Sequence, residues 1–171
     1  MSSTEEDKAA LQGKALRKVA LGSPSGLLAF GFGSGLSPWA PGTMGTIVAI
    51  PFALLLHPFP LLMQMGVIAV LFVAGIYFCN KTSRRLGTHD FGGIVWDEIT
   101  GFLLCSLAAP VSIQGYLAAF ILFRFFDIYK PWPIGAVDQK VEGGFGIMAD
   151  DIIAAIYTAA ILLLLVRWEF I

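Results

Sequence analysis

The chain has 171 residues, and Asp, Glu, Lys and Arg together make up only 13% of them, about half the share in a typical soluble domain. Apolar residues make up 57%, and the mean hydropathy is +0.78. This composition excludes a disordered chain, and a net charge of −1 argues against nucleic-acid binding, which needs a basic surplus. We therefore expect an integral membrane protein of one domain.

The first 20 residues form a polar segment that holds seven of the 23 charged residues. A signal peptide would start with basic residues followed by an apolar stretch, whereas this segment starts acidic and polar. We expect residues 1–20 to form a tail or an interfacial helix. Residues 21–171 are then expected to form a single membrane-embedded helical domain.

Five apolar segments follow, at residues 47–56, 61–79, 99–109, 111–123 and 152–166. Only the second approaches the roughly 20 residues that cross a bilayer upright. We expect Pro51 to interrupt the first segment, residues 57–60 to turn it into the second, and Pro110 to separate the third from the fourth. The predicted fold class is all-α: a compact bundle embedded in the membrane, with short or broken helices and a Gly/Pro-rich loop.

The basic residues predict which way the bundle faces. The turns at residues 57–60 and around Pro110 contain no Lys or Arg, whereas the N-terminal segment contains four and the loop at residues 81–98 contains three. Two helical hairpins would place the N-terminal segment and both charged loops on one side of the membrane. The excess of basic residues makes that side cytoplasmic.

A glycine-rich stretch covers residues 31–45, with five Gly and two Pro in 15 residues. Clustered backbone N–H groups can bind an anion, and no Gly-Lys-Ser/Thr follows, so the stretch is not a Walker loop. The candidate phosphate-binding residues are Gly33, Ser34, Gly35 and Thr43. The alternative is close helix packing through small residues.

Five acidic residues lie at the boundaries of apolar segments. They are Asp97, Glu98, Asp127, Asp150 and Asp151. Acids at such positions cost energy unless they are paired, bound to metal or facing water, which makes them candidates for function. The alternatives are simpler: stabilisation of helix N-termini by acids, and an i,i+3 ion pair between Arg124 and Asp127.

These acids, together with Arg124, Lys130 and the glycine-rich stretch, fit Mg²⁺ and a phosphate group. The metal would stabilise developing charge and activate a water for attack on phosphorus. A cysteine phosphatase is not supported: Cys79 and Arg85 have the Cys-x5-Arg spacing, but no glycines lie between them to wrap a phosphate.

The motifs at residues 31–45, 90–101, 123–133 and 143–151 resemble those of the phosphatidylglycerophosphatase A family. The resemblance implies an all-α bundle in the bacterial inner membrane, acting in phospholipid biosynthesis. It implies Mg²⁺-dependent hydrolysis of phosphatidylglycerophosphate to phosphatidylglycerol and inorganic phosphate.

The five acids match the acidic positions of that family. We expect Glu98, Asp127 and Asp151 to bind Mg²⁺, with Asp97 or Asp150 as base or orienting group. Arg124 and Lys130 would bind the phosphate, assisted by backbone N–H groups of residues 33–45. The expected partners are therefore the lipid substrate and the membrane, without nucleic acid.

Two other classes of function use the same residues. A small membrane transporter or channel component would use Asp97, Asp127 and Asp151 as a cation pathway, without needing the glycine-rich stretch or Arg124. In a structural membrane scaffold, the charges would only mark the ends of loops.

Overall fold

The computed structural model describes residues 13–88 and 91–171, and this part of the chain is helical without strands. Its elements are α2 (Pro24–Ala29), the 3₁₀ helix η1 (Gly31–Leu36), α3 (Pro41–Leu56), α4 (Leu61–Leu86), α5 (Trp96–Ser106), α6 (Ile113–Tyr129), α7 (Ile134–Lys140) and α8 (Gly143–Arg167). The all-α prediction is confirmed. Residues 13–20 of the predicted N-terminal segment are helical, and residues 1–12 lie outside the described part.

Two of these helices, α4 and α8, are long and apolar enough to cross a membrane. The outer surface of α4 is apolar: Leu62 is 83% exposed and Val70 is 67% exposed. Exposed apolar surface of this extent is unusual in a soluble monomer, where it marks an interaction site.

The short helix α5 occupies the centre of the bundle. Nine of its 11 residues are buried, and at 1.5 Å per residue it is only about 16 Å long. It packs against α3, α4, α6 and α8, and the rings of Phe102 on α5 and Phe123 on α6 meet edge to face, with their centroids 6.2 Å apart. Side chains at the first turn of α5 are therefore surrounded by protein.

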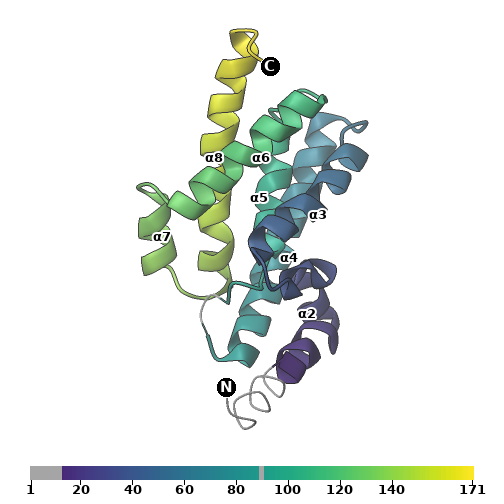
Figure 1. Ribbon diagram of the computed structural model, residues 1–171, viewed down its shortest axis with the longest axis vertical. Helices are drawn as coiled ribbons and strands as arrows, with labels where there is room; N and C mark the ends of the chain where they lie inside the picture. Colours follow the sequence, from purple (N-terminus) through teal and green to yellow (C-terminus); the bar gives the residue numbers. More distant parts are fainter. Residues whose placement is uncertain (1–12, 89–90) are drawn as a thin grey trace.

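The helices form two hairpins followed by α8 (Figure 1). The α3–α4 and α5–α6 turns lie at the upper end of the view, with the end of α8. The α4–α5 connection and the start of α8 lie at the lower end. The two expected hairpins thus bring the charged α4–α5 connection and the start of α8 to the same end of the bundle.

One prediction about helix boundaries is wrong. Pro51 does not interrupt α3, which runs unbroken from Pro41 to Leu56. Proline has no backbone N–H, so Pro51 cannot donate the usual hydrogen bond within the helix. Pro51 lies on the exposed side of α3, and the packing of Ala49 and Ala53 against the core supports the helix at this point. The helix α8 begins at Gly143, so Asp150 and Asp151 lie two turns inside it. The alternative that these two acids stabilise a helix N-terminus therefore does not apply to them.

Close packing of α8 on α4 depends on Gly144. A methyl group there would lie 1.9 Å from the carbonyl oxygen of Ile76, a backbone atom that has little room to move. We predict that Gly144→Ala destabilises the protein by about 1–3 kcal/mol, measured by thermal unfolding in detergent. Gly66→Ala is the control, because a methyl group at Gly66 meets nothing within 4 Å and alanine favours helix. Equal stability of the two variants would contradict this packing.

Candidate active site

Two helices bring three carboxylates together. Asp97 and Glu98 lie in the first turn of α5, and Asp151 faces them from α8. One carboxylate oxygen from each residue lies within 4.8 Å of the others. This spacing allows one cation to contact all three side chains.

The fourth carboxylate of the site, Asp127, comes from the last turns of α6 together with a guanidinium. Arg124 forms an ion pair with Asp127, three residues along the same helix, and its Nη1 lies 3.6 Å from Glu98 Oε1. Asp127 also lies close enough to Asp151 for the two carboxyl groups to interact electrostatically. Arg124 therefore links α6 to the acids on α5 and α8.

The site contains more negative than positive groups. Asp97, Glu98, Asp127 and Asp151 face one guanidinium, that of Arg124. Burial, and then the charges of Glu98 and Asp151, raises the pKa of Asp97 well above its ordinary value. Burial also raises the pKa of Glu98 to about 7. These carboxyl groups are therefore poorly stabilised as anions without a cation.

Several polar atoms at the site are buried without a hydrogen-bond partner among the described residues. They include one oxygen each of Asp97, Glu98 and Asp151, together with Arg124 Nε. Unsatisfied buried polar atoms are rare in folded proteins and call for an explanation such as an ion or ligand. Here the oxygens suit a cation, and the guanidinium nitrogen suits an anion.

The start of α3 completes the site through Gly42. A methyl group at Gly42 would lie 2.1 Å from Glu98 Oε1 and 3.0 Å from both terminal nitrogens of Arg124. A larger residue at position 42 would require these two side chains to move. The first N–H groups of a helix have no partner within the helix, and Ala40 provides no side-chain cap. The N–H groups of Gly42 and Thr43 are therefore available to an anion.

The other candidates in the glycine-rich stretch lie elsewhere. A methyl group at Gly35 would lie 1.9 Å from the carbonyl oxygen of Gly93, and one at Gly33 would lie nearest to Leu21. The hydroxyl of Ser34 donates to the carbonyl oxygen of Gly31 at 2.9 Å. These contacts belong to close packing of η1, which was the alternative interpretation of the stretch.

Lys130 and Asp150 form a separate ion network. Lys130 Nζ lies 2.7 Å from an oxygen of Asp138 on α7 and 2.7 Å from an oxygen of Asp150 on α8. Burial lowers the pKa of Lys130, but these two carboxylates outweigh that effect and hold the pKa above its ordinary value. The adjacent acids Asp150 and Asp151 thus face different partners, as their roughly 100° separation on a helix requires.

Sequence reasoning missed Asp138 as a partner of Lys130. It also placed Asp127 in the ligand set where the structure places Asp97 beside Glu98 and Asp151. The spacing of Lys130 and Asp138 carried no signal, because residues 131–133 break the helix between them.

Most of the chain is similar in sequence to known proteins. Residues 27–166 match the family Phosphatidylglycerophosphatase A. The chain is 44% identical over 146 residues to phosphatidylglycerophosphatase A of Escherichia coli, covering 85% of each protein. It is 46% identical over 160 residues to phosphatidylglycerophosphatase A of Haemophilus influenzae, covering 90% of this chain and 95% of that one.

The chain belongs to the phosphatidylglycerophosphatase A family. It is therefore a phosphatase, and the expected resemblance is confirmed. A Bacteroides thetaiotaomicron protein with the provisional name phosphatidylinositol-3-phosphatase is 40% identical over 150 residues, covering 83% of this chain and 92% of that protein. No solved structure matches the chain.

Cys79 is poorly placed for a covalent mechanism in this phosphatase. It is buried within α4, and its sulfur lies 3.8 Å from the sulfur of Met148. Arg85, the other residue of the Cys-x5-Arg spacing, donates to Ser23 Oγ at 2.8 Å. The two side chains do not form a phosphate cradle, so the acidic site is the candidate for catalysis.

We predict that Gly42→Ala lowers phosphatase activity at least about tenfold, because the added methyl group displaces Glu98 and Arg124. The measurement is phosphate release by purified protein in detergent. Gly92→Ala is the control, since a methyl group at Gly92 meets nothing within 4 Å. Normal activity of the Gly42 variant would show that this close approach is not needed.

The neighbouring variants Asp150→Asn and Asp151→Asn should differ. Asp150→Asn removes a carboxylate from the partly exposed Lys130, so we predict a loss of about 1–2 kcal/mol of stability, between the values for surface and buried pairs. Asp151→Asn removes a candidate ligand and should abolish stabilisation by divalent metal. Thermal unfolding with and without Mg²⁺ measures both effects. If only Asp150→Asn lost the stabilisation by Mg²⁺, Asp150 rather than Asp151 would be the candidate metal ligand.

Proposed function

We propose that this protein is a Mg²⁺-dependent lipid phosphatase that hydrolyses phosphatidylglycerophosphate to phosphatidylglycerol and inorganic phosphate in phospholipid biosynthesis. The observation that carries the proposal is the group of three carboxylates on α5 and α8, beside a guanidinium, in a chain of this family. The family match favours this enzyme over a transporter or channel component.

The proposed metal ligands are Asp97, Glu98 and Asp151. Their oxygens lie within 4.8 Å of one another, and each side chain has a buried oxygen without a partner among the described residues. All are hard oxygen donors, which Mg²⁺ prefers, and the ion usually completes its coordination with waters and substrate phosphates. When bound, Mg²⁺ would stabilise charge that develops on the phosphate.

The proposed phosphate-binding groups are Arg124 and the start of α3. The buried Nε of Arg124 has no hydrogen-bond partner among the described residues, and Gly42 lies directly against its guanidinium. Helix N-termini and guanidinium groups both bind phosphate favourably through N–H donors and positive charge. Lys130 is held by Asp138 and Asp150, so its proposed contribution is to position α7 and α8.

Asp127 is the proposed proton acceptor for the attacking water. It lies beside the proposed ligand Asp151 and is paired with Arg124, so it can reach the reacting groups without being one of the three ligands. As the P–O bond of the substrate breaks, the same proton can return to the leaving oxygen of the glycerol. This assignment replaces Asp97 or Asp150 as the expected base.

In the proposed topology, α4 and α8 cross the bacterial inner membrane and the site faces the cytoplasm. The last turn of α4 carries Arg84 and Arg85 at the end where the site lies, and basic residues favour the cytoplasmic side. The start of α4, at the other end, carries no acidic or basic residue in its first turns. The enzyme would therefore act on lipids of the cytoplasmic leaflet.

The metal proposal predicts different losses for two variants. Glu98→Gln should lower kcat at least about a hundredfold and abolish the rise in unfolding temperature that Mg²⁺ causes. Asp127→Asn should lower kcat to a similar degree but retain that rise, because Asp127 is not among the proposed ligands. The wild-type protein after EDTA treatment is the reference. Unchanged stabilisation by Mg²⁺ in Glu98→Gln would remove Glu98 from the metal site.

The substrate proposal predicts that phosphate is released fastest from phosphatidylglycerophosphate. The comparison substrate is phosphatidylinositol 3-phosphate, chosen because of the name of the Bacteroides relative. Purified protein in mixed micelles with Mg²⁺ should give at least about tenfold higher kcat/KM for phosphatidylglycerophosphate. Faster release from the inositol lipid would overturn the substrate assignment, but the protein would still be a lipid phosphatase.

A further inference from the structure

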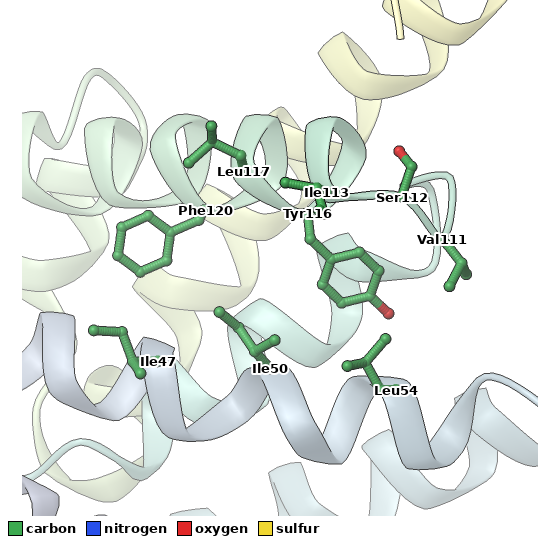
Figure 2. A pocket seen from close by; sticks show the side chains of 9 residues that line it. All are labelled: Ile47, Ile50, Leu54, Val111, Ser112, Ile113, Tyr116, Leu117 and Phe120. Carbon is green, nitrogen blue, oxygen red and sulfur yellow. The ribbon is translucent and has the colours of Figure 1, made fainter.

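An apolar groove runs between α3 and α6 (Figure 2). Ile47, Ile50 and Leu54 line it from α3, and Tyr116, Leu117 and Phe120 line it from α6. Figure 2 shows side chains of the two helices pointing toward each other across the gap. Its volume is about 670 Å³, within the range of pockets that hold small molecules.

One end of the groove lies next to the active site. On α6, Phe120 and Arg124 are four residues apart and therefore lie on the same face of the helix. On α3, Ile47 lies about one turn beyond Gly42, which contacts both Arg124 and Glu98. A molecule whose phosphate is bound by Arg124 could therefore continue directly into this end of the groove.

The length of the groove suits the tail of a membrane lipid. From Gly42 to Leu54 there are 12 residue steps, or about 18 Å along the helix axis. One leaflet of a bilayer has a hydrocarbon depth of about 15 Å, half of the roughly 30 Å core. The groove itself covers the last seven of these steps, about 10 Å from Ile47 to Leu54. Its far end therefore lies approximately the depth of one leaflet from the phosphate site.

The groove is lined by hydrocarbon side chains and is open to the surroundings. Its polar groups are the hydroxyls of Ser112 and Tyr116, which lie toward the end away from the active site. Ile113 is 88% exposed and Leu117 is 55% exposed, so the opening extends along α6. A chain in the bilayer can enter such a groove from the side, without leaving the hydrocarbon region.

We propose that this groove binds one acyl chain of the phospholipid substrate while its phosphate is bound at Arg124 and the start of α3. The inference rests on the proposed function and adds the part of the protein that recognises the substrate as a lipid. The chain runs from Ile47 and Phe120, beside the phosphate, toward Leu54 and Val111. Long-chain substrates gain binding energy along the whole groove, and short-chain substrates gain it only near Ile47.

The test measures kcat/KM for phosphatidylglycerophosphate with short, medium and long acyl chains. Leu54→Trp fills the far end of the groove, and Ile47→Trp fills the end near the phosphate. Both positions are more than two-fifths exposed, so a larger side chain can be accommodated without disrupting the core. Val70→Trp is the control, because Val70 is exposed on α4 outside the groove.

We expect Leu54→Trp to lower the ratio of kcat/KM for long chains to that for short chains about tenfold, the equivalent of about two buried methylene groups. Medium chains should be spared in that variant. Ile47→Trp should lower the ratio for medium and long chains alike, and Val70→Trp should keep the wild-type ratio.

Other outcomes would overturn the inference. An unchanged ratio in both groove variants would mean that bulk lipid alone fills the groove. A change of oligomeric state in the groove variants, measured by light scattering in detergent, with equal losses for all chain lengths, would assign the groove to a second copy of the chain. Failure of the wild type to release phosphate from any of these substrates would instead contradict the proposed function itself.

Discussion

Four carboxyl groups share a buried site with one guanidinium, and the centre of the bundle is organised around that imbalance. Charge in a low-dielectric interior is costly unless it is compensated, and Arg124 compensates only part of it. Each of α5, α6 and α8 contributes one or two of the acids, and α3 approaches them through Gly42. A cation and a phosphate at the site would explain the arrangement, because each would pair with buried atoms that have no partner among the described residues.

The role of α3 follows from its position between the polar and apolar parts of the structure. Its first turn lies against Arg124 and Glu98, and its later turns line an apolar groove with α6. One helix therefore connects a site suited to a phosphate with a surface suited to hydrocarbon. A phospholipid has the same order of parts, with a charged headgroup followed by acyl chains. In the proposed enzyme, α3 would align the substrate by matching that order.

Parts of the site could be predicted because they depend on local spacing. Arg124 and Asp127 are three residues apart, so their ion pair requires only that this segment be helical. Likewise, adjacent residues on a helix point in different directions, which explains why Asp150 and Asp151 have different partners. The start of α8 could not be predicted in this way, because Gly143, Gly144 and Gly146 are weak helix formers. Its first turn instead packs closely on α4 through Gly144.

The sequence by itself determined the all-α class, the family, the clustering of most charges in the N-terminal segment and two loops, and the candidate acids. These features depend on composition, periodicity and the order of motifs. Only the tertiary structure decided that Asp97 joins Glu98 and Asp151, that Lys130 is held by Asp138 and Asp150, and that Gly42 approaches Arg124. The physical reason is that these contacts join residues on different helices, and their geometry depends on how the helices rotate and pack against one another.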